Sequence, residues 1–209
     1  MSWQLWLAFV AAACAISLSP GPGAVAVMSA SLQHGFARGY FATFGLVLGF
    51  WTQLVVVAAG LGAILATSAL AFALVKWLGV AYLVYLGIRQ WRAAPLVFPT
   101  CGQGMPTTRR RIVAEAWLLN AANPKGTAFM LAVVPQFLTP GEPLVPQYLA
   151  IGATLAFTDL VVMAGYTALA SRVLRSLREP HHVRWMNRTF GTLFIAAGTL
   201  LATFKRAHA

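Results

Sequence analysis

The chain has 209 residues, of which 59% are hydrophobic and only 9% are charged. Soluble domains carry roughly 45–50% apolar and about 25% charged residues, so this composition excludes an ordinary soluble fold and predicts an integral membrane protein. The net charge of +11 does not indicate nucleic-acid binding, because the basic residues lie in short segments between apolar runs and not in a stripe with stacking aromatic residues.

Six apolar runs are long enough to cross a bilayer as helices, because a crossing needs about 20 mostly apolar residues. The runs cover residues 3–30, 40–65, 69–88, 112–138, 146–170 and 187–204. The first run is expected to stay in the mature protein, because no Lys or Arg precedes it to form the basic start of a signal peptide. The sequence therefore predicts an all-α integral membrane protein with six transmembrane helices.

The basic residues lie on one side of these predicted helices. Eleven of the 15 Lys and Arg residues fall in the segments that join the first helix to the second, the third to the fourth and the fifth to the sixth. The positive-inside rule places such segments in the cytoplasm and so predicts that both termini are periplasmic. The whole chain, 1–209, is expected to form one transmembrane domain, with halves of about 1–92 and 109–209 and a basic cytoplasmic linker at about 89–111.

Three helices per half give the two halves opposite orientations, and each half carries a similar interruption. The first run contains SLSPGPG at 17–23, and the fourth run contains NAANPKG at 120–126. Interrupted helices at corresponding places in two inverted halves indicate the binding site of a transporter. The sequence thus predicts two inverted three-helix repeats, with a site where the interruptions meet.

Both interruptions are predicted to start a helix in the middle of the membrane. Ser19 and Asn123 are good N-cap residues, and Pro20 and Pro124 would take the first helical position, where a missing N–H costs nothing. Such a start exposes N–H groups and the positive end of a helix dipole, which suit a carboxylate. Proline kinks repaired by neighbouring helices are the alternative. The candidate substrate-binding residues are Ser19, Pro20, Gly21, Pro22, Gly23, Asn123, Pro124 and Lys125.

Two charged residues, Asp159 and Lys125, lie inside these apolar runs and are expected to interact with groups of opposite charge. Asp159 lies about 13 residues into the fifth run. A carboxylate at that depth is costly to insert and usually marks an ion or proton pathway, so Asp159 is the candidate proton-coupling residue. Lys125 follows a helix start, where a cation opposes the dipole, so an anion is expected beside it. Either the substrate's carboxylate or Asp159 would serve, and a permanent Asp159–Lys125 pair is the purely structural alternative.

Two glutamines are further candidates for the site. Gln53 follows Pro20 by 33 residues, much as Asp159 follows Pro124 by 35, so the two polar residues occupy similar places in the two halves. Gln136 lies near the outer end of the fourth run, where it would line an exit or simply end the helix.

The sequence predicts no metal, cofactor or catalytic centre. His181 and His182 are adjacent, but no constellation of cysteines or carboxylates accompanies them. Cys14 and Cys101 do not make a disulfide framework, and both are expected to be free thiols without a catalytic role.

Together these segments resemble those of the lysine exporter superfamily of bacterial amino-acid exporters, called LysE/RhtB. The resemblance covers essentially the whole chain and rests on SLSPGPG (17–23), VKWLGVAYLVYLGIRQWR (75–92), NAANPKGTAFMLAVVPQF (120–137) and Asp159. The short loops and the segment GYTALASR (165–172) are most similar to the homoserine/threonine efflux branch.

The resemblance implies a secondary exporter of the bacterial inner membrane that the proton gradient drives. Its partners would be protons, membrane lipids and a small amino acid such as homoserine, homoserine lactone or threonine. Export of lysine, leucine or cysteine is the alternative within the family, and a homodimer is left open. An integral-membrane enzyme and a passive channel are the rival classes. A lone Asp159 does not supply an enzyme's nucleophile, metal cluster or paired acids, and a channel needs no titratable residue near both breaks.

Overall fold

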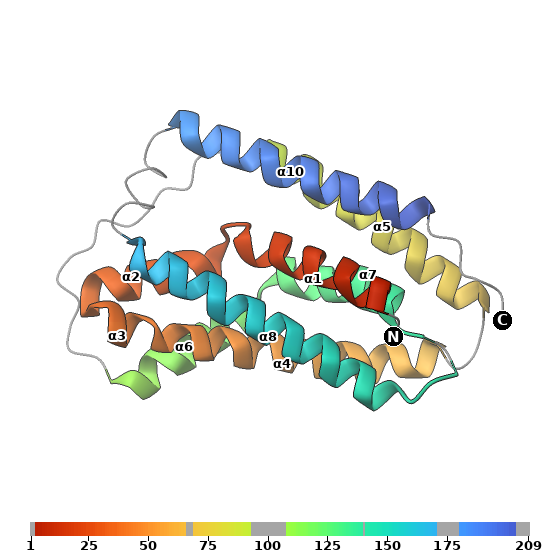
Figure 1. Cartoon of the computed structure of the whole chain (residues 1–209), viewed down its shortest axis with the longest axis horizontal. Coiled ribbons are helices and arrows are strands. Elements are labelled where there is room, and N and C mark those ends of the chain that lie inside the picture. The colour runs from red at the N-terminus through yellow and green to blue at the C-terminus, as the bar shows by residue number, and fades with distance from the viewer. Residues whose placement is uncertain (1–2, 66–68, 93–107, 140, 171–179, 204–209) are drawn as a thin grey trace.

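The computed structural model describes residues 3–65, 69–92, 108–139, 141–170 and 180–203 (Figure 1). Every regular element in these ranges is a helix, which confirms the all-α prediction for the described part of the chain. The elements are α1 (Trp3–Leu18), α2 (Pro22–His34), α3 (Phe36–Gly39), α4 (Phe41–Leu65), α5 (Ala69–Trp91), α6 (Arg109–Ala121), α7 (Pro124–Val133), the 3₁₀ turn η1 (Val134–Phe137), α8 (Leu144–Ala168) and α10 (Pro180–Thr203).

Each of the six predicted runs contains helix in its described part, with differences from the prediction at the polar ends. α6 begins at Arg109 and α10 at Pro180, earlier than the predicted starts at 112 and 187, because both helices continue past the apolar run into polar turns. Thr108 caps α6 by accepting a hydrogen bond from the backbone N–H of Arg111 at 3.3 Å. Residues 109–111 therefore belong to a helix and not to the predicted linker, whose residues 93–107 lie outside the described ranges.

Two helical stretches of the described chain are long and apolar enough to cross a membrane, namely Phe36–Gly60 and Leu144–Ala168. A third crossing results if α1 and α2, which are bent by 55° at their break, count as one span. Large apolar side chains are exposed on both stretches, for example Val55 at 63% and Phe157 at 67%. Lipid is the natural solvent for such surfaces, and they account for the high apolar content of the chain.

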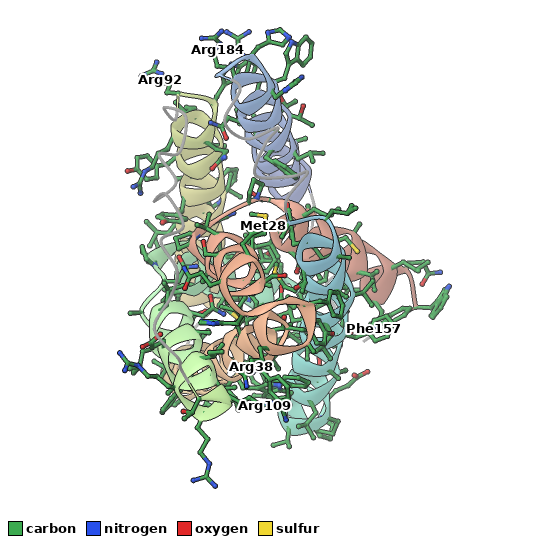
Figure 2. The ribbon with its side chains drawn as sticks, turned by 90° about the vertical axis from the view of Figure 1, so that its left-hand side faces the viewer. Met28, Arg38, Arg92, Arg109, Phe157 and Arg184 are labelled. Atoms are coloured by element: carbon green, nitrogen blue, oxygen red, sulfur yellow. The ribbon has the colours of Figure 1, made fainter. Side chains whose placement is uncertain are left out.

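The helices form a body from which one pair projects. α5 and α10 lie side by side along their length and stand apart from the other helices (Figures 1 and 2). Within the body, α4 packs along α6, and α8 packs against both α1 and α4. The projecting pair joins the body chiefly through α7, where Gly79 of α5 lies directly against Ala132.

Several arginines lie at one end of the molecule. Figure 2 looks onto the end at which Arg38, Arg92, Arg109 and Arg184 lie. α1 begins and α10 finishes at the opposite end (Figure 1). The fold thus gathers arginines of α3, α6 and α10, and the one that follows α5, at one end of the helices.

Close packing in the body depends on small residues. One buried apolar cluster contains Phe9 and a second contains Met28. Gly45 and Gly49 lie on the face of α4 that touches α6, and a Cβ on Gly49 would lie only 2.6 Å from the Cβ of Asn120. Glycines spaced in this way let two membrane helices approach closely. The approach brings α4 against the break between α6 and α7.

Candidate functional site

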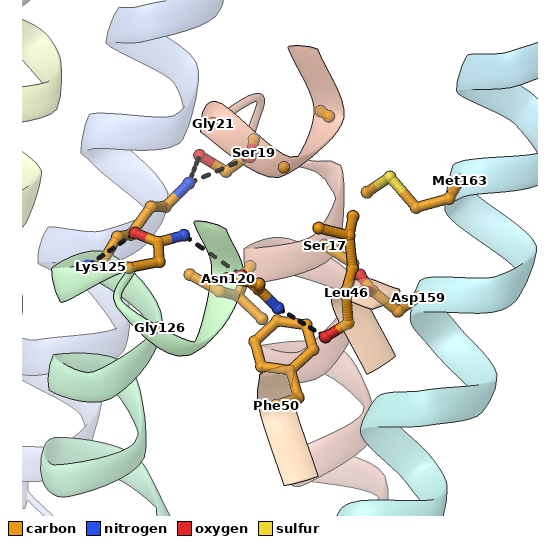
Figure 3. A pocket seen from close by; sticks show the side chains of 14 residues that line it. Ser17, Ser19, Gly21, Leu46, Phe50, Asn120, Lys125, Gly126, Asp159 and Met163 are labelled. Atoms are coloured by element: carbon orange, nitrogen blue, oxygen red, sulfur yellow. Dashed lines mark hydrogen bonds between the residues drawn. The ribbon is translucent and has the colours of Figure 1, made fainter. Parts of the chain in front are cut away.

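A pocket lies where the two helix breaks meet, and its space is about 410 Å³ including the part that opens outward (Figure 3). Its polar lining residues are Ser17, Ser19, Asn120, Asn123, Lys125 and Asp159. Its other lining residues are Ile16, Gly21, Gly23, Ala24, Leu46, Phe50, Gly126 and Met163. The pocket therefore contains most of the predicted site residues, drawn from both halves of the chain.

The break in the fourth run has the predicted form. α6 ends at Ala121 and α7 begins at Pro124. Asn123 is the N-cap, with an extended backbone, and its side-chain oxygen accepts the N–H of Lys125 at 3.0 Å. The expected helix start at Asn123 and Pro124 is confirmed.

The break in the first run differs from the prediction. α2 begins at Pro22 with Gly21 as its N-cap, and no side chain caps it. The N–H of Ser19 bonds to the carbonyl of Ala15 at 3.1 Å, so Ser19 belongs to the end of α1 and Pro20 to the connection. The prediction that Ser19 and Pro20 start the helix was therefore wrong. Pro22 also suits the first helical position, where a missing N–H costs nothing. Gly21 before it takes the extended backbone that a following proline favours.

Lys125 connects the two breaks. Its ammonium donates to Ser19, at 2.7 Å to Oγ and 3.0 Å to the carbonyl oxygen. Ser19 and Leu18 supply the last carbonyls of α1, which form the negative end of its dipole. Tyr166 of α8 donates to the Leu18 carbonyl at 2.7 Å. The cation that opposes the start of α7 is thus stabilised by the end of α1, a partner that the sequence did not suggest.

Asp159 lies on the other side of the pocket from Lys125, beside Ser17 of α1 (Figure 3). The two side chains are deeply buried, with Asp159 2% and Ser17 4% exposed. The Ser17 hydroxyl lies close enough to influence the Asp159 carboxyl, but among the described residues no hydrogen bond of normal geometry reaches Oδ2 of Asp159 or Oγ of Ser17. Buried polar atoms are normally paired, so these two mark a place that suits a hydrogen-bond donor. An ammonium group or a proton would satisfy the carboxylate.

The two candidate glutamines do not line this pocket. Gln53 of α4 instead directs its Nε2 at backbone carbonyls around the end of α6. Gln136 lies in η1, where its buried Nε2 has no partner among the described residues. Ser17 and Asn120 line the pocket but were not among the predicted site residues. The Nδ2 of Asn120 donates to the Leu46 carbonyl at 2.6 Å. A signal was available, because Ser17 and Asn120 are each the first polar residue of their interrupted motif.

The pocket carries opposite charges on its two sides. Lys125 and the start of α7 lie on one side, and Asp159 with Ser17 on the other (Figure 3). Leu46 and Phe50 add apolar surface. In the described part of the chain, no group of three or more His, Cys, Asp or Glu could hold a metal ion. The arrangement complements a small molecule that carries both an anionic and a cationic group.

Sequence comparisons identify a matching family and several relatives. The family described as LysE type translocator matches residues 14–204. The chain is 39% identical over 208 residues to the homoserine/homoserine lactone efflux protein of Salmonella typhimurium. This match covers 99% of the chain and 100% of the relative. It is 42% identical over 206 residues to an uncharacterized membrane protein of Vibrio cholerae, with 98% and 100% covered. It is 25% identical over 197 residues to a leucine efflux protein of Enterobacter sp., with 93% of each covered. No solved structure matches the chain.

Proposed function

Because the chain belongs to the family of LysE type translocators, we propose that it exports a small amino acid across the bacterial inner membrane. It is a transporter and not an enzyme, as the family and the efflux-protein relatives indicate. The resemblance to the LysE/RhtB superfamily is confirmed. The substrate, the coupling ion and the membrane topology are parts of the proposal.

The observation that carries the proposal is the opposite charge on the two sides of one buried pocket. A substrate carboxylate would bind the Lys125 ammonium and the N–H groups in the first turns of α2 and α7, where Gly23 and Gly126 line the pocket. Its ammonium would bind Asp159 and the hydroxyl of Ser17. A zwitterionic amino acid would place an anion beside Lys125 and a cation beside Asp159 at once, which lowers the cost of holding both charges inside a membrane.

Proton coupling is assigned to Asp159. The carboxylate is buried against Ser17, and one of its oxygens has no partner among the described residues. A proton and the substrate's ammonium would compete for this one carboxylate. Protonation from the periplasmic side would then release the substrate outward, and return of the proton to the cytoplasm would reset the site.

The proposed topology has six spans in two inverted halves. Its support is that each half contains a broken helix whose break reaches the same pocket. Arg38, Arg92, Arg109 and Arg184 lie at one end of the molecule, which is the arrangement expected of a cytoplasmic face (Figure 2). On this topology both termini are periplasmic, and transport follows from rocking of one half against the other around the pocket.

Homoserine, homoserine lactone and threonine are the first substrates to test, because a relative that covers the whole chain is named for homoserine and homoserine lactone efflux. Leucine is the second candidate. A more distant relative is named for leucine efflux, and Leu46 and Phe50 give the pocket an apolar wall.

Inside-out membrane vesicles provide the test, because export then appears as uptake of a radiolabelled amino acid. An acidic vesicle interior should drive uptake of homoserine, and an uncoupler should abolish it. The panel would include threonine, leucine, lysine and cysteine, with vesicles from cells that lack the protein as background. If no member of the panel accumulates above that background, the proposal of amino-acid export fails.

Asp159→Asn tests the coupling role. We expect the variant to reach the membrane at the normal level but to lose gradient-driven uptake, because an amide cannot exchange the proton. Glu115→Gln is the matched control, since Glu115 is an exposed acid paired with Arg111 at 2.8 Å on the surface of α6. Normal gradient-driven uptake by Asp159→Asn would refute the assignment.

A further inference from the structure

We infer that Gln53 is a positioning residue of the transport site, which holds the end of α6 so that the break before α7 keeps its shape. The inference rests on the proposed function, because transport is what the shaped break would serve. It gives Gln53 a different role from the substrate contact that the sequence suggested, since its side chain lies outside the pocket lining.

The break leaves the last carbonyls of α6 without their ordinary helical partners. The Asn120 carbonyl would bond to the N–H four residues later, but that residue is Pro124, which has no N–H. The Ala121 carbonyl would bond to the N–H of Lys125, but that N–H is donated to the Asn123 side chain. The Asn120 carbonyl accepts the N–H of Asn123 at 3.0 Å instead, which is a tighter turn than a helical one. In a membrane interior no bulk water supplements such bonds, so a further donor from elsewhere in the protein would stabilise the break.

Gln53 supplies that donor from the middle of α4. Its Nε2 lies 2.7 Å from the Asn120 carbonyl oxygen, 3.0 Å from that of Asn123 and 3.4 Å from that of Ala121. The side chain is only 3% exposed. Asn120 and Ala121 end α6, whereas Asn123 is the N-cap of α7. One amide group therefore ties together both sides of the break.

The same amide fits tightly against the pocket wall. A Cβ placed on Gly126 would lie 2.6 Å from Oε1 of Gln53 and 3.2 Å from its Nε2. Gly126 is the third residue of α7 and lines the pocket. A shift of the Gln53 amide would therefore pass directly to the first turn of α7, and from there to the groups proposed to hold the substrate.

The first experiment compares Gln53→Leu with Gln90→Leu. Gln90 is the matched control, because its Nε2 also joins two helices, at 2.9 Å from Oδ1 of Asn187, but between α5 and α10. We expect Gln53→Leu to speed amide hydrogen exchange in residues 118–127 of the purified protein. We also expect its half-saturating homoserine concentration to rise about tenfold, the factor that one net buried hydrogen bond represents. Gln90→Leu should change neither quantity.

Gly126→Ala provides a second approach that leaves Gln53 in place. Alanine suits a helix better than glycine, so any harm should come from contact with the glutamine amide. We expect Gly126→Ala to reproduce both effects in the wild-type chain and to add nothing to Gln53→Ala. This pair decides the matter if Gln53→Leu does not reach the membrane.

Three results would overturn the inference. One is unchanged exchange and half-saturation in both Gln53→Leu and Gly126→Ala. Another is an equal effect of Gly126→Ala with and without the glutamine, and the third is an equal effect of Gln90→Leu. If the wild-type chain transports nothing, the proposed function fails instead, and the exchange comparison still decides whether Gln53 holds the break.

Discussion

Replacement of Lys125 by methionine separates the cost of a buried charge from its use in transport. The two hydrogen bonds to Ser19, at 2.7 and 3.0 Å, involve a charged donor. Such bonds contribute about 1.5–3 kcal/mol each, so their loss costs roughly 3–6 kcal/mol. Against this, removal of the ammonium from the protein interior regains several kcal/mol of desolvation. Loss of the repulsion between the ammonium and the positive start of α7 stabilises the variant by a further contribution of about 0.3–2 kcal/mol. These contributions nearly cancel.

We therefore expect Lys125→Met to change the free energy of unfolding by no more than about 1 kcal/mol, which corresponds to about 2–4 °C in Tm for a chain of this size. Thermal unfolding in detergent, followed by tryptophan fluorescence, measures this shift. Arg111→Met is the control for loss of a cation. Its exposed pair with Glu115 at 2.8 Å contributes under about 1 kcal/mol.

Transport by the same variant should fall much further than stability. Loss of one partner of a buried ion pair costs about 3–5 kcal/mol, so homoserine uptake at low concentration should drop by more than about 100-fold. Homoserine lactone is an internal control, because it keeps the ammonium but has no free carboxylate, and it should be affected much less. A Tm lowered by more than about 10 °C would show that Lys125 chiefly stabilises the fold. Equal losses for homoserine and its lactone would refute the carboxylate assignment.

Two further predictions concern packing and the ammonium side of the pocket. Gly45→Ala should destabilise the protein by about 1–3 kcal/mol, because its Cβ would collide with the Val113 carbonyl of α6. Gly60→Ala in the same helix is the control, because a Cβ there meets nothing within 4 Å and should leave Tm unchanged or slightly higher. Equal Tm values for Gly45→Ala and Gly60→Ala would contradict the packing of α4 on α6. Ser17→Ala should change Tm only slightly, because the Ser17 hydroxyl lies beside Asp159 but makes no hydrogen bond of normal geometry to a described residue. It should raise the half-saturating homoserine concentration by about tenfold, and unchanged transport would remove Ser17 from the site.

The two breaks show what local sequence can determine. In the fourth run a single proline follows a good capping residue, so Asn123 and Pro124 could be placed correctly. The first run offers two prolines two residues apart, and either could begin a helix. The N–H of Ser19 stays bonded to α1, so Ser19 cannot cap a new helix and α2 begins at Pro22. Rules about single residues do not distinguish these cases, because both prolines satisfy them.

Hydrogen-bond partners that lie far apart in the chain could not be predicted from the sequence. Gln53 was a candidate because its place in the first half resembles that of Asp159 in the second, but its acceptor at Asn120 is 67 residues away. The contact depends on how closely α4 approaches α6, which in turn depends on Gly45 and Gly49. The same holds for Lys125, whose acceptor Ser19 is 106 residues away in the first break. Burial could be predicted for these residues, but the identity of their partners could not.

The contacts at the two breaks follow one pattern. In each half of the chain a helix ends at the break, and side chains from the other half bind the carbonyls at that end. Gln53, from the first half, caps the end of α6, and Lys125 and Tyr166, from the second, cap the end of α1. Of these contacts, the bond between Lys125 and Ser19 has both members in the pocket lining. On the proposed function, a substrate carboxylate competes with Ser19 for Lys125. Binding would then loosen the end of α1, while Gln53 keeps the end of α6 in place. A charge beside a helix break is costly by itself, but on this proposal it would make the contact between the two breaks depend on what the pocket contains.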